Sequence, residues 1–323
     1  VTLITSRFSH SIKKHRYDIP HLKGVRVIML EEPGYKKNVG YARVKSHWYF
    51  CQNLKKYLRN DDVFDLVYSA FPMVQTNLIL RKLCVKKSIP FLVDVQDVWP
   101  EAISGAIPWL SGKIGRFLML PLTARSNTVY AAADGLIAVS DTYLKRADIS
   151  NLTSQCKAVV YLGSDKIWFN EDEILSIRDT SRPLKAVYLG TLGGSYDVET
   201  IVRAAARLPN VEIEVIGYGP HEKGLRLLND QLGAPVSFTG ALSHDEAMRR
   251  TMQADVAINA IKGQALQSIT NKLSDYFCAG LPIISSQNNE EVKELLSIGG
   301  GLSYIPGDAE SLANVLSKLA SDP

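Results

Sequence analysis

Short apolar runs alternate with helical segments along most of the chain, and this alternation restricts the fold more than any other feature of the sequence. The apolar runs in the front half cover 1–6, 25–30, 64–69, 90–95 and 135–140. Those in the back half cover 184–190, 211–217, 236–240, 254–260 and 281–286. Such continuous apolar strands are typical of parallel sheets with helices on both faces. The sequence therefore predicts an α/β fold.

A polar segment without periodicity divides this pattern into two parts. It covers 164–183 and contains the charged run N-E-D-E-I. A chain of 323 residues also exceeds the size of one typical hydrophobic core. We therefore predict an N-terminal domain over 1–163, a linker over 164–183 and a second doubly wound domain over 184–323. Ligands of such domains bind at the carboxyl ends of the strands.

Composition indicates a cytoplasmic protein. Hydrophobic residues make up 46% of the chain, but no apolar run approaches the roughly 18 residues that a membrane-spanning helix needs. The four cysteines are scattered and lack metal-ligand spacing, which fits a reducing compartment and argues against a zinc site. The chain opens on Val1 without the charged and apolar leader of a secreted protein.

Charge is distributed unevenly along the chain. Residues 1–150 hold 22 Lys and Arg against 12 Asp and Glu, and the remainder holds 15 against 21. The basic front half indicates either solvated helix faces or a surface that meets an anionic partner, such as a lipid leaflet. The mixed basic and apolar stretch 112–125 is compatible with a membrane interface, with a lipid-linked acceptor, or with core packing. Aromatic residues do not interleave with the basic runs, so we expect no nucleic-acid partner.

A glycine-containing loop follows the first strand of the back half. Gly190, Gly193 and Gly194 lie between that strand and a helix, and Gly217 follows the next strand. Glycines allow backbone amides to approach a phosphate closely, although they also permit an ordinary tight turn. The dinucleotide fingerprint G-x-G-x-x-G is absent from the sequence, which argues against an oxidoreductase.

The stretch S-I-T-N-K-L-S-D-Y-F-C-A-G-L-P-I-I-S-S places charges at the start of an apolar helix. Lys272 and Asp275 are three residues apart, so they lie on one helix face and could form a weak local ion pair. A lysine at a helix N-terminus is unfavourable for the helix dipole. An anion bound there would remove this conflict, so Lys272 is a candidate phosphate-binding residue.

Several motifs together resemble a known enzyme family. They are I-T-S-R-F-S-H (4–10), P-G-Y-K-K-N-V (33–39), D-V-Q-D-V-W-P (94–100), I-A-V-S (137–140), L-G-T-L-G (189–193) and N-K-L-S-D-Y-F-C-A-G-L-P (271–282). In this order they are similar to bacterial GT-B glycosyltransferases of family 4, in the branch that builds lipopolysaccharide O-antigen and capsule. The resemblance implies two Rossmann-like domains whose parallel sheets face an interdomain cleft. It also implies that a strand and a glycine-rich loop normally precede the segment matching 1–6.

The resemblance further implies a donor site in the back domain. Its residues would be Gly190, Thr191, Gly193, Gly194, Gly217, Thr270, Asn271, Lys272 and Asp275. Asp275 would hold the ribose, and Lys272 would neutralise the departing diphosphate with the amides of Gly193 and Gly194. The chain departs from the family in two places. Gln267 stands where a glutamate is usual, and Thr191 and Tyr196 stand near the usual basic pair.

For the front domain the resemblance implies an acceptor site. Gln96 occupies the place of a frequent family histidine. Asp97 could accept the proton of the acceptor hydroxyl or could brace the turn before Pro100. The expected catalytic residues are Asp97, Lys272 and Gln267. The expected acceptor-side residues are His10, Asp94, Trp99 and Ser140.

The resulting expectation is a retaining transferase at the inner face of the cytoplasmic membrane. It would move a sugar from a nucleotide-sugar, usually a UDP-sugar, to a saccharide acceptor carried on a polyprenyl diphosphate, in surface polysaccharide biosynthesis. No metal or other cofactor is expected, because the chain has no D-x-D triplet and Lys272 could replace the metal charge. Two alternatives remain open: a sugar-nucleotide epimerase of the same architecture, and a non-catalytic glycosyltransferase-like partner protein.

Overall fold

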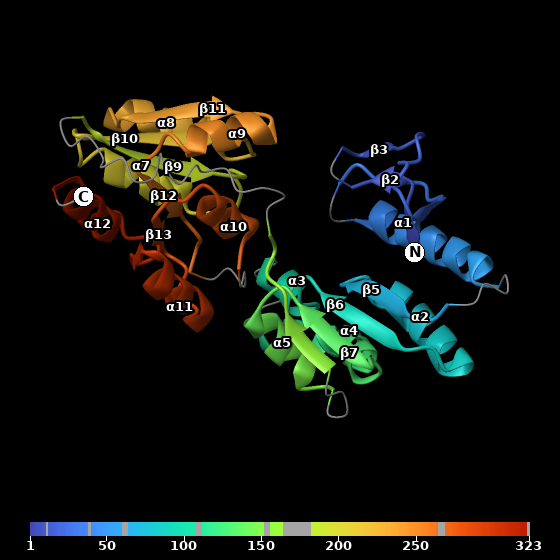
Figure 1. The fold of residues 1–323 in the computed structure, drawn as a ribbon. Helices are drawn as coiled ribbons and strands as arrows, with labels where there is room; N and C mark the ends of the chain where they lie inside the picture. The colour runs from blue at the N-terminus through green and yellow to red at the C-terminus, as the bar shows by residue number, and fades with distance from the viewer. Residues whose placement is uncertain are drawn as a thin grey trace. The chain divides into compact units, whose positions relative to one another are not determined.

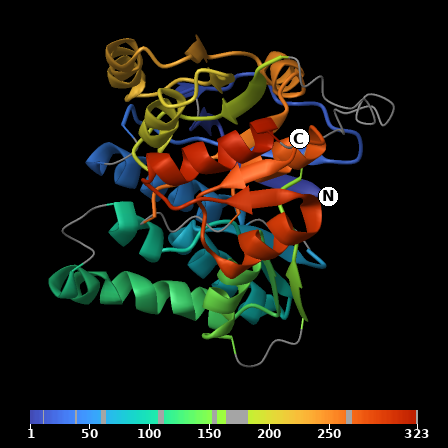
Figure 2. The same ribbon diagram turned by 90° about the vertical axis from the view of Figure 1, so that its left-hand side faces the viewer.

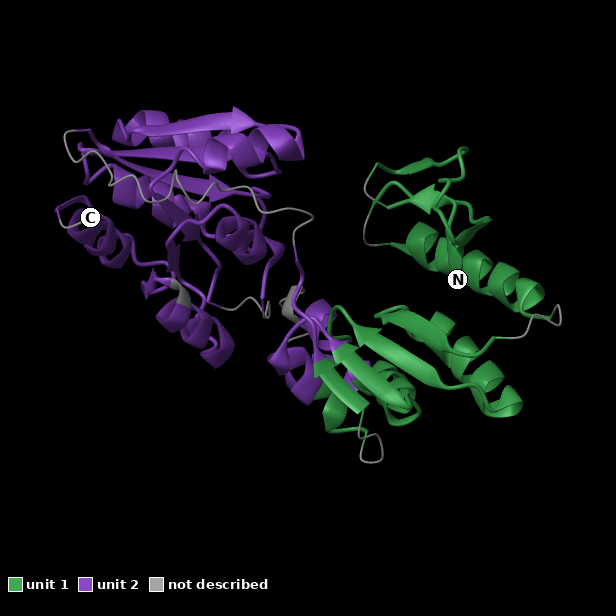
Figure 3. Ribbon diagram, viewed as in Figure 1, with its two compact units in different colours: residues 1–99, 120–137, 146–158 green, residues 100–119, 138–145, 159–323 purple. Residues whose placement is uncertain are grey.

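The computed structural model describes most of the chain as two compact units (Figure 3). The described residues are 1–10, 12–37, 40–59, 64–106, 112–151, 156–163, 182–263 and 269–321. Unit 1 contains 1–99, 120–137 and 146–158, and unit 2 contains 100–119, 138–145 and 159–323. Most of the predicted linker, 164–181, lies outside the described residues.

Unit 2 is built on a six-stranded parallel sheet (Figure 1). The strands are β9 (Leu184–Leu189), β10 (Val211–Ile216), β11 (Val236–Gly240), β12 (Val256–Asn259), β13 (Ile283–Ser285) and β14 (Gly301–Ser303), in the order β11-β10-β9-β12-β13-β14. β9 and β10 are paired in register from Leu184 and Val211 to Leu189 and Ile216. Both strands therefore end at the same edge of the sheet.

Helices cover both faces of this sheet, and apolar side chains of the strands are buried on each face. They are α7 (Val198–Ala205), α8 (Glu222–Leu232), α9 (His244–Thr251), α10 (Asn271–Cys278), α11 (Glu290–Gly299) and α12 (Ala309–Ser321). One buried cluster joins Ile201 of α7 and Leu312 of α12 to the strands. The other joins Met248 of α9 and Tyr276 of α10 to the opposite face.

Unit 1 contains two separate groups of strands. A two-stranded parallel sheet pairs β1 (Thr2–Ser6) with β4 (Arg26–Leu30), and β2 (Phe8–Ser9) forms an antiparallel pair with β3 (Lys14–His15). A four-stranded sheet has the order β5-β6-β7-β8. These strands are β5 (Val67–Phe71), β6 (Phe91–Val95), β7 (Gly135–Ala138) and β8 (Cys156–Val159). Unit 1 also contains α1 (Tyr41–Tyr57) and α2 (Val74–Lys87). The helix α3 (Glu101–Ala106) belongs to unit 2, and α4 (Lys113–Ala131) and α5 (Asp141–Asp148) each have residues in both units.

The edge strands β1 and β5 line one cavity of about 580 Å³. Among the described residues, each of these strands is hydrogen-bonded to a neighbouring strand on one side only, β1 to β4 and β5 to β6. Side chains of α1 and α2 complete the lining, which is mainly apolar. In the described part of the chain, no helix is long and apolar enough to cross a membrane.

The observed architecture confirms the predicted α/β class with parallel sheets. The predicted strand 64–69 is found two to three residues later, as β5, and several elements were not predicted at all. The β2–β3 pair is one of them, because strands of two residues leave no periodic pattern in the sequence. Figure 2 shows the fold from the side on which α12 and the C-terminal end face the viewer.

Candidate functional site

Glycines occupy the carboxyl ends of three neighbouring strands in unit 2. Gly190 follows β9, Gly217 follows β10 and Gly240 ends β11, and all three have positive φ angles, of 140°, 140° and 75°. The Gly190 amide donates a hydrogen bond to the Ile216 carbonyl at 2.8 Å, and the Gly217 amide donates to the Gly240 carbonyl at 3.0 Å. A Cβ atom on Gly217 would lie 1.9 Å from the Gly190 oxygen. This edge of the sheet is therefore bare backbone, which a ligand can approach closely.

The N-terminus of α10 lies at the same edge of the sheet. Its N-cap residue is Thr270, whose side chain makes no capping hydrogen bond. The Thr270 hydroxyl oxygen is buried and lacks a hydrogen-bond partner among the described residues. Uncapped amides and a partial positive charge at a helix N-terminus favour an anion. An anion there would also supply the partner that the buried hydroxyl lacks.

Lys272, on the first turn of α10, is buried against two tyrosines. Its side chain is 7% exposed. Nζ donates a hydrogen bond to the Tyr188 hydroxyl at 2.6 Å and lies 4.1 Å and 3.4 Å from the ring centroids of Tyr188 and Tyr196. Among the described residues, no carboxylate forms an ion pair with this amine. We call Lys272, Tyr188 and Tyr196 the lysine cradle.

Burial lowers the pKa of Lys272 from 10.5 to about 6. At neutral pH the side chain is therefore mainly an uncharged amine in the ligand-free protein. A bound anion would favour the protonated form, because an opposite charge within a few ångströms raises the pKa of a lysine. Protonation would also raise the number of N–H donors on Nζ from two to three, of which one is directed to Tyr188.

Gly190 leaves the space that the lysine side chain occupies. A Cβ atom on Gly190 would lie 2.2 Å from Lys272 Cε and 2.8 Å from Nζ. Such contacts are far inside the van der Waals distance, so a larger residue would displace the amine. The glycine that the sequence marks as a phosphate-loop residue thus also accommodates the lysine cradle.

Two buried tyrosine hydroxyls hold the cradle to the end of β9. The Tyr188 hydroxyl donates to the Thr191 carbonyl at 2.9 Å, which fixes the loop after the strand. The Tyr276 hydroxyl accepts a hydrogen bond from the Leu189 amide at 2.8 Å and donates to the Ile258 carbonyl at 3.2 Å. Burial raises the pKa of both phenols, so both keep their protons. The geometry of the site is therefore fixed from inside the core.

Asp275 lies on the same helix but does not pair with Lys272. Its carboxylate is 4.0 Å from His244 Nε2, and burial raises its pKa. The local ion pair considered for Lys272 and Asp275 is not formed, because the lysine points into the tyrosine cradle instead. The carboxylate keeps 21% of its side chain exposed, so it is accessible to a ligand hydroxyl.

The other predicted donor residues gather in the loop after β9 and at the start of α10. Thr191 and Gly194 are exposed and Gly193 is half-buried, and Asn271 is exposed at the first position of α10. Gln267 lies outside the described residues. The roles assigned to these residues stay predictions. The tyrosines of the cradle carry no motif of their own, although Tyr196 stands where the resemblance leads one to expect a basic side chain.

The predicted residues at the end of β6 form local hydrogen bonds. Asp97 accepts a hydrogen bond from the Val98 amide at 2.8 Å and another from the Trp99 side chain, while burial raises its pKa. Asp94 is buried and accepts a hydrogen bond from Gln96 Nε2 at 2.8 Å. These contacts fit the alternative in which Asp97 braces the turn, and they leave its catalytic role a prediction.

Asp94 has a further partner that the sequence did not indicate. The Tyr68 hydroxyl donates a hydrogen bond to Asp94, and burial, together with this bond, raises the pKa of Tyr68 to about 12. Tyr68 lines the cavity between β1 and β5. Ser140 lies elsewhere and is fully buried, where its hydroxyl accepts the Tyr143 amide at 3.2 Å at the start of α5. This contact is typical of a helix N-cap.

His10 belongs to a polar cluster on unit 1 that sequence reasoning identified only in part. Its Nδ1 lies 2.7 Å from the Tyr35 hydroxyl and 3.2 Å from Lys13 Nζ. Burial, Lys13 and Arg43 lower the pKa of His10. Arg43 and His47 line the same cavity as His10. Tyr35 lies within the P-G-Y-K-K-N-V motif, and this motif was the sequence feature that could have indicated the rest of the cluster.

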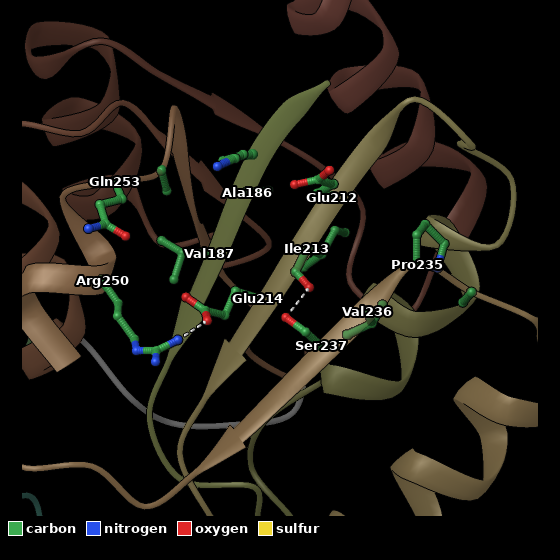
Figure 4. Close-up of a pocket in the computed structure, with 13 residues that line it drawn as sticks. Ala186, Val187, Glu212, Ile213, Glu214, Pro235, Val236, Ser237, Arg250 and Gln253 are labelled. Atoms are coloured by element: carbon green, nitrogen blue, oxygen red, sulfur yellow. Dashed lines mark hydrogen bonds and ion pairs between the residues drawn. The ribbon is translucent and has the colours of Figure 1, made fainter. Parts of the chain in front are cut away.

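A second hollow in unit 2 crosses the first halves of the strands β9, β10 and β11 (Figure 4). Its volume is about 430 Å³. Lys185 and Glu212 are opposite one another across the strands, and Arg250 Nη1 pairs with Glu214 Oε1 at 2.8 Å. This hollow lies in the first halves of the strands, whereas the lysine cradle lies at their carboxyl ends. Ligands of parallel α/β sheets bind at the carboxyl ends, so the cradle is the better candidate site.

The overall fold is that of GT-B glycosyltransferases, which have two Rossmann-like domains. Sucrose-phosphate synthase from Thermosynechococcus elongatus aligns with a TM-score of 0.71 at 17% identity, over 100% of this chain and 80% of that one. Alr3699/HepE from Anabaena, crystallised with UDP, aligns with a TM-score of 0.66 at 15% identity, over 92% and 77%.

Residues 184–322 match the sequence model of the family described as "Glycosyl transferases group 1". This part of the chain, which carries the lysine cradle, therefore forms a domain of that family. A curated relative is the putative colanic acid biosynthesis glycosyltransferase WcaL of Salmonella typhimurium, 23% identical over 271 residues and 76% of this chain. The chain spans 66% of the length of that relative.

Proposed function

We propose that the protein is a glycosyltransferase that takes its sugar from a nucleotide diphosphate donor. The observation that carries this proposal is the lysine cradle: a buried amine without a carboxylate partner among the described residues, beside an uncapped helix N-terminus and glycine strand ends. These are the features that accommodate a diphosphate. The group 1 glycosyltransferase domain that contains them supports the same reaction class.

UDP is the proposed nucleotide. HepE, which has a similar fold, has been crystallised with UDP and with UDP-glucose, and this supports the choice. In the proposed complex Lys272 neutralises the diphosphate, the amides of Gly193, Gly194 and α10 donate to it, and Asp275 accepts the ribose hydroxyls. Withdrawal of negative charge from the leaving UDP would lower the barrier to cleavage of its bond to the sugar.

The proposed acceptor is a saccharide on a lipid carrier, in bacterial surface polysaccharide synthesis. The relation to WcaL, named for colanic acid biosynthesis, supports this assignment. Transfer with retention of configuration and without a metal ion stays part of the proposal. The metal part is tested by assaying turnover in EDTA, where an unchanged rate is expected.

Calorimetry tests the donor assignment. Titration with UDP should give saturable binding, and Lys272→Met should weaken it by at least tenfold, since a single charged donor to a diphosphate is worth about 2–3 kcal/mol. Lys223→Met, on the exposed face of α8, is the matched control and should bind like the wild type. Absence of UDP binding at millimolar concentration would contradict the proposal and favour the non-catalytic alternative.

Transfer is then measured as release of UDP from UDP-sugars with and without lipid-linked saccharide. Acceptor-dependent release supports the transferase. Conversion of the UDP-sugar to an epimer without any acceptor would instead identify the epimerase alternative.

A further inference from the structure

Basic side chains surround Tyr35 in unit 1, beyond the carboxyl ends of the paired strands β1 and β4. The Tyr35 hydroxyl lies 2.7 Å from His10 Nδ1, and Lys13 Nζ lies 4.8 Å from the centroid of the Tyr35 ring. The guanidinium carbon of Arg43 is 5.7 Å from the same centroid. The ring of His47, one turn further along α1, meets the Tyr35 ring edge-on at a centroid distance of 5.9 Å. We call these five residues the Tyr35 cluster.

The hydrogen bonds of the Tyr35 cluster determine the tautomer of His10. An ammonium group can only donate, so His10 Nδ1 accepts the hydrogen bond from Lys13 Nζ at 3.2 Å. Burial raises the pKa of Tyr35, so its hydroxyl keeps the proton that it directs to the same nitrogen. The proton of the neutral imidazole is therefore on Nε2. His10 is exposed, and its Nε2 makes no hydrogen bond to another described residue, so this N–H can donate to a ligand.

The positive charges of the Tyr35 cluster repel one another. Desolvation lowers the pKa of His10 and of His47, and the charge of Arg43 lowers both further. The same two causes lower the pKa of Lys13. A bound anion would remove this repulsion, because an opposite charge within a few ångströms favours the protonated forms.

One carboxylate, that of Glu32, lines the same cavity as the cluster, and its charge acts on His47. Its two oxygens accept hydrogen bonds from the hydroxyls of Ser6 and Ser46, and the residue is 8% exposed. The Ser46 hydroxyl in turn accepts the Gly34 amide at 2.8 Å. Glu32 therefore braces the segment after β4 from inside and does not occupy the exposed side of the cluster.

Lys13 has a backbone conformation that lysine rarely adopts. Its φ angle is 56°, in the left-handed region, at the end of the turn that joins β2 to β3. The Lys13 amide donates to the Ser9 carbonyl at 2.9 Å and closes this turn. Glycine and asparagine suit such a position better than lysine does. The turn thus has no need of a lysine, and an unfavourable residue of this kind points to a function of its side chain.

We propose that the Tyr35 cluster binds a phosphate group of the acceptor through Lys13 Nζ, the Arg43 guanidinium and the Nε2–H of His10. Donors from three side chains match the several oxygens of a phosphate better than the two oxygens of a carboxylate. The cluster also lies beyond the carboxyl ends of parallel strands, where α/β sheets bind their ligands. The assignment to an acceptor rests on the proposed function, whereas the binding of phosphate does not.

Calorimetry with pyrophosphate tests the site in the full chain. The chain carries Lys272→Met, so that the lysine cradle contributes little to the signal. We expect saturable binding that Lys13→Asn and Arg43→Gln each weaken by about tenfold or more, because both remove a charged donor to a phosphate. Glucuronate, which offers a carboxylate, should bind at least about tenfold more weakly than pyrophosphate.

Two matched controls should bind pyrophosphate like the parent protein. Lys23→Asn changes an exposed lysine of another turn in unit 1, and Arg59→Gln changes an exposed arginine just beyond the other end of α1. Melting temperatures separate a binding role of Lys13 from a structural one. Lys13→Asn should not lower the melting temperature, because asparagine tolerates the left-handed conformation better than lysine. A purely structural contact between Lys13 and the Tyr35 ring would instead make this variant melt earlier.

Kinetics distinguish a phosphate of the acceptor from inorganic phosphate. With Lys272 intact, Lys13→Asn should raise the KM for the lipid-linked saccharide by about tenfold or more. The KM for the UDP-sugar and the dissociation constant of UDP should stay unchanged, since no residue of the Tyr35 cluster belongs to the lysine cradle. A site for inorganic phosphate would leave the acceptor KM unchanged, and added phosphate would alter the rate of the wild type but not that of Lys13→Asn.

Three results would overturn the proposal. The first is the absence of pyrophosphate binding, or binding that Lys13→Asn and Arg43→Gln both retain. The second is tighter binding of glucuronate than of pyrophosphate. The third is the kinetic behaviour of a site for inorganic phosphate. UDP calorimetry of the wild type in the same experiments keeps a failure of this proposal apart from a failure of the donor assignment.

Discussion

Replacement of Lys272 by methionine should stabilise the protein while it weakens donor binding. Methionine has nearly the length of lysine and no charge, so it can occupy the cradle without the cost of burying an ammonium group. The pKa of Lys272 is about 6 in the folded protein against 10.5 ordinarily. Each pKa unit corresponds to about 1.4 kcal/mol, so at pH 7 the buried lysine costs about 5 kcal/mol.

The direction of the pH dependence follows from proton binding. Between pH 6 and 10.5 the unfolded chain carries a proton on Lys272 that the folded chain lacks. The free energy of unfolding of the wild type therefore rises with pH in this window, by about 1.4 kcal/mol per pH unit from this group. Below pH 6 both states are protonated and this slope disappears. Lys272→Met removes the contribution, so its advantage over the wild type should shrink as pH rises.

Urea unfolding at pH 7, 8 and 9 measures these quantities. We expect Lys272→Met to be more stable than the wild type at pH 7 by about 3–5 kcal/mol, allowing for its lost hydrogen bond to Tyr188. The difference should fall by roughly 3 kcal/mol between pH 7 and pH 9. Lys223→Met, on the exposed face of α8, should change stability by less than about 0.5 kcal/mol throughout.

The pH dependence of UDP binding should reflect the protonation of the same Lys272 amine. Since the charged amine is the form that binds a diphosphate, the dissociation constant of the wild type should increase about tenfold per pH unit between pH 7 and 9. Lys272→Met should bind weakly and without this dependence. A methionine variant that is less stable than the wild type at pH 7, or a wild type whose affinity is flat with pH, would refute an uncharged Lys272 in the free protein.

Two further substitutions test the surroundings of the cradle, and a third tests an ion pair at the opposite edge of the sheet. Gly190→Ala should abolish UDP binding, because its Cβ would lie 2.2 Å from Lys272 Cε and the backbone there has a positive φ. Calorimetry should detect no heat of binding. Retained affinity for UDP would contradict the cradle geometry. Tyr276→Phe should lower the free energy of unfolding by about 1–3 kcal/mol, because it orphans the buried Leu189 amide; an unchanged urea midpoint would refute this role. Asp255→Asn should lower the free energy of unfolding by about 1–3 kcal/mol in the same assay, because it removes the bidentate ion pair with Arg182. An unchanged urea midpoint would argue against a stabilising role of this pair.

The sequence predicted the strands β9 to β13 of unit 2, because their residue patterns favour the same structure that the tertiary packing requires. The short strand β14 was not predicted. The strands β9, β12 and β13 are largely apolar, β10 alternates apolar residues with Glu212 and Glu214, and a glycine follows β9 and β10 where the chain has to turn with positive φ. Lys272 could be selected as well, since a lysine at a helix start conflicts with the helix dipole. These signals lie within a few residues of each other in the sequence.

The lysine cradle itself could not be predicted in this way. Tyr188 is embedded in an apolar strand and looks like an ordinary core residue, whereas its hydroxyl meets a lysine 84 positions away. Likewise, the spacing of Lys272 and Asp275 allows an ion pair, but the space beside Gly190 and the face of the Tyr196 ring direct the amine elsewhere. Contacts between segments that are distant in the sequence determine both the Tyr188–Lys272 hydrogen bond and the absence of a Lys272–Asp275 ion pair among the described residues. The spacing of residues along one helix cannot predict such contacts.

The glycine strand ends restrict how this site can evolve. A side chain at Gly217 would lie 1.9 Å from a backbone oxygen, and one at Gly190 would expel the lysine. Substitutions at these two glycines would therefore disrupt the site and could not change its preference for a donor. Altered specificity has to arise in the exposed loop residues after β9, such as Thr191, or on α10, while the strand ends stay unchanged. A library directed at changing the sugar or nucleotide should accordingly leave both glycines fixed.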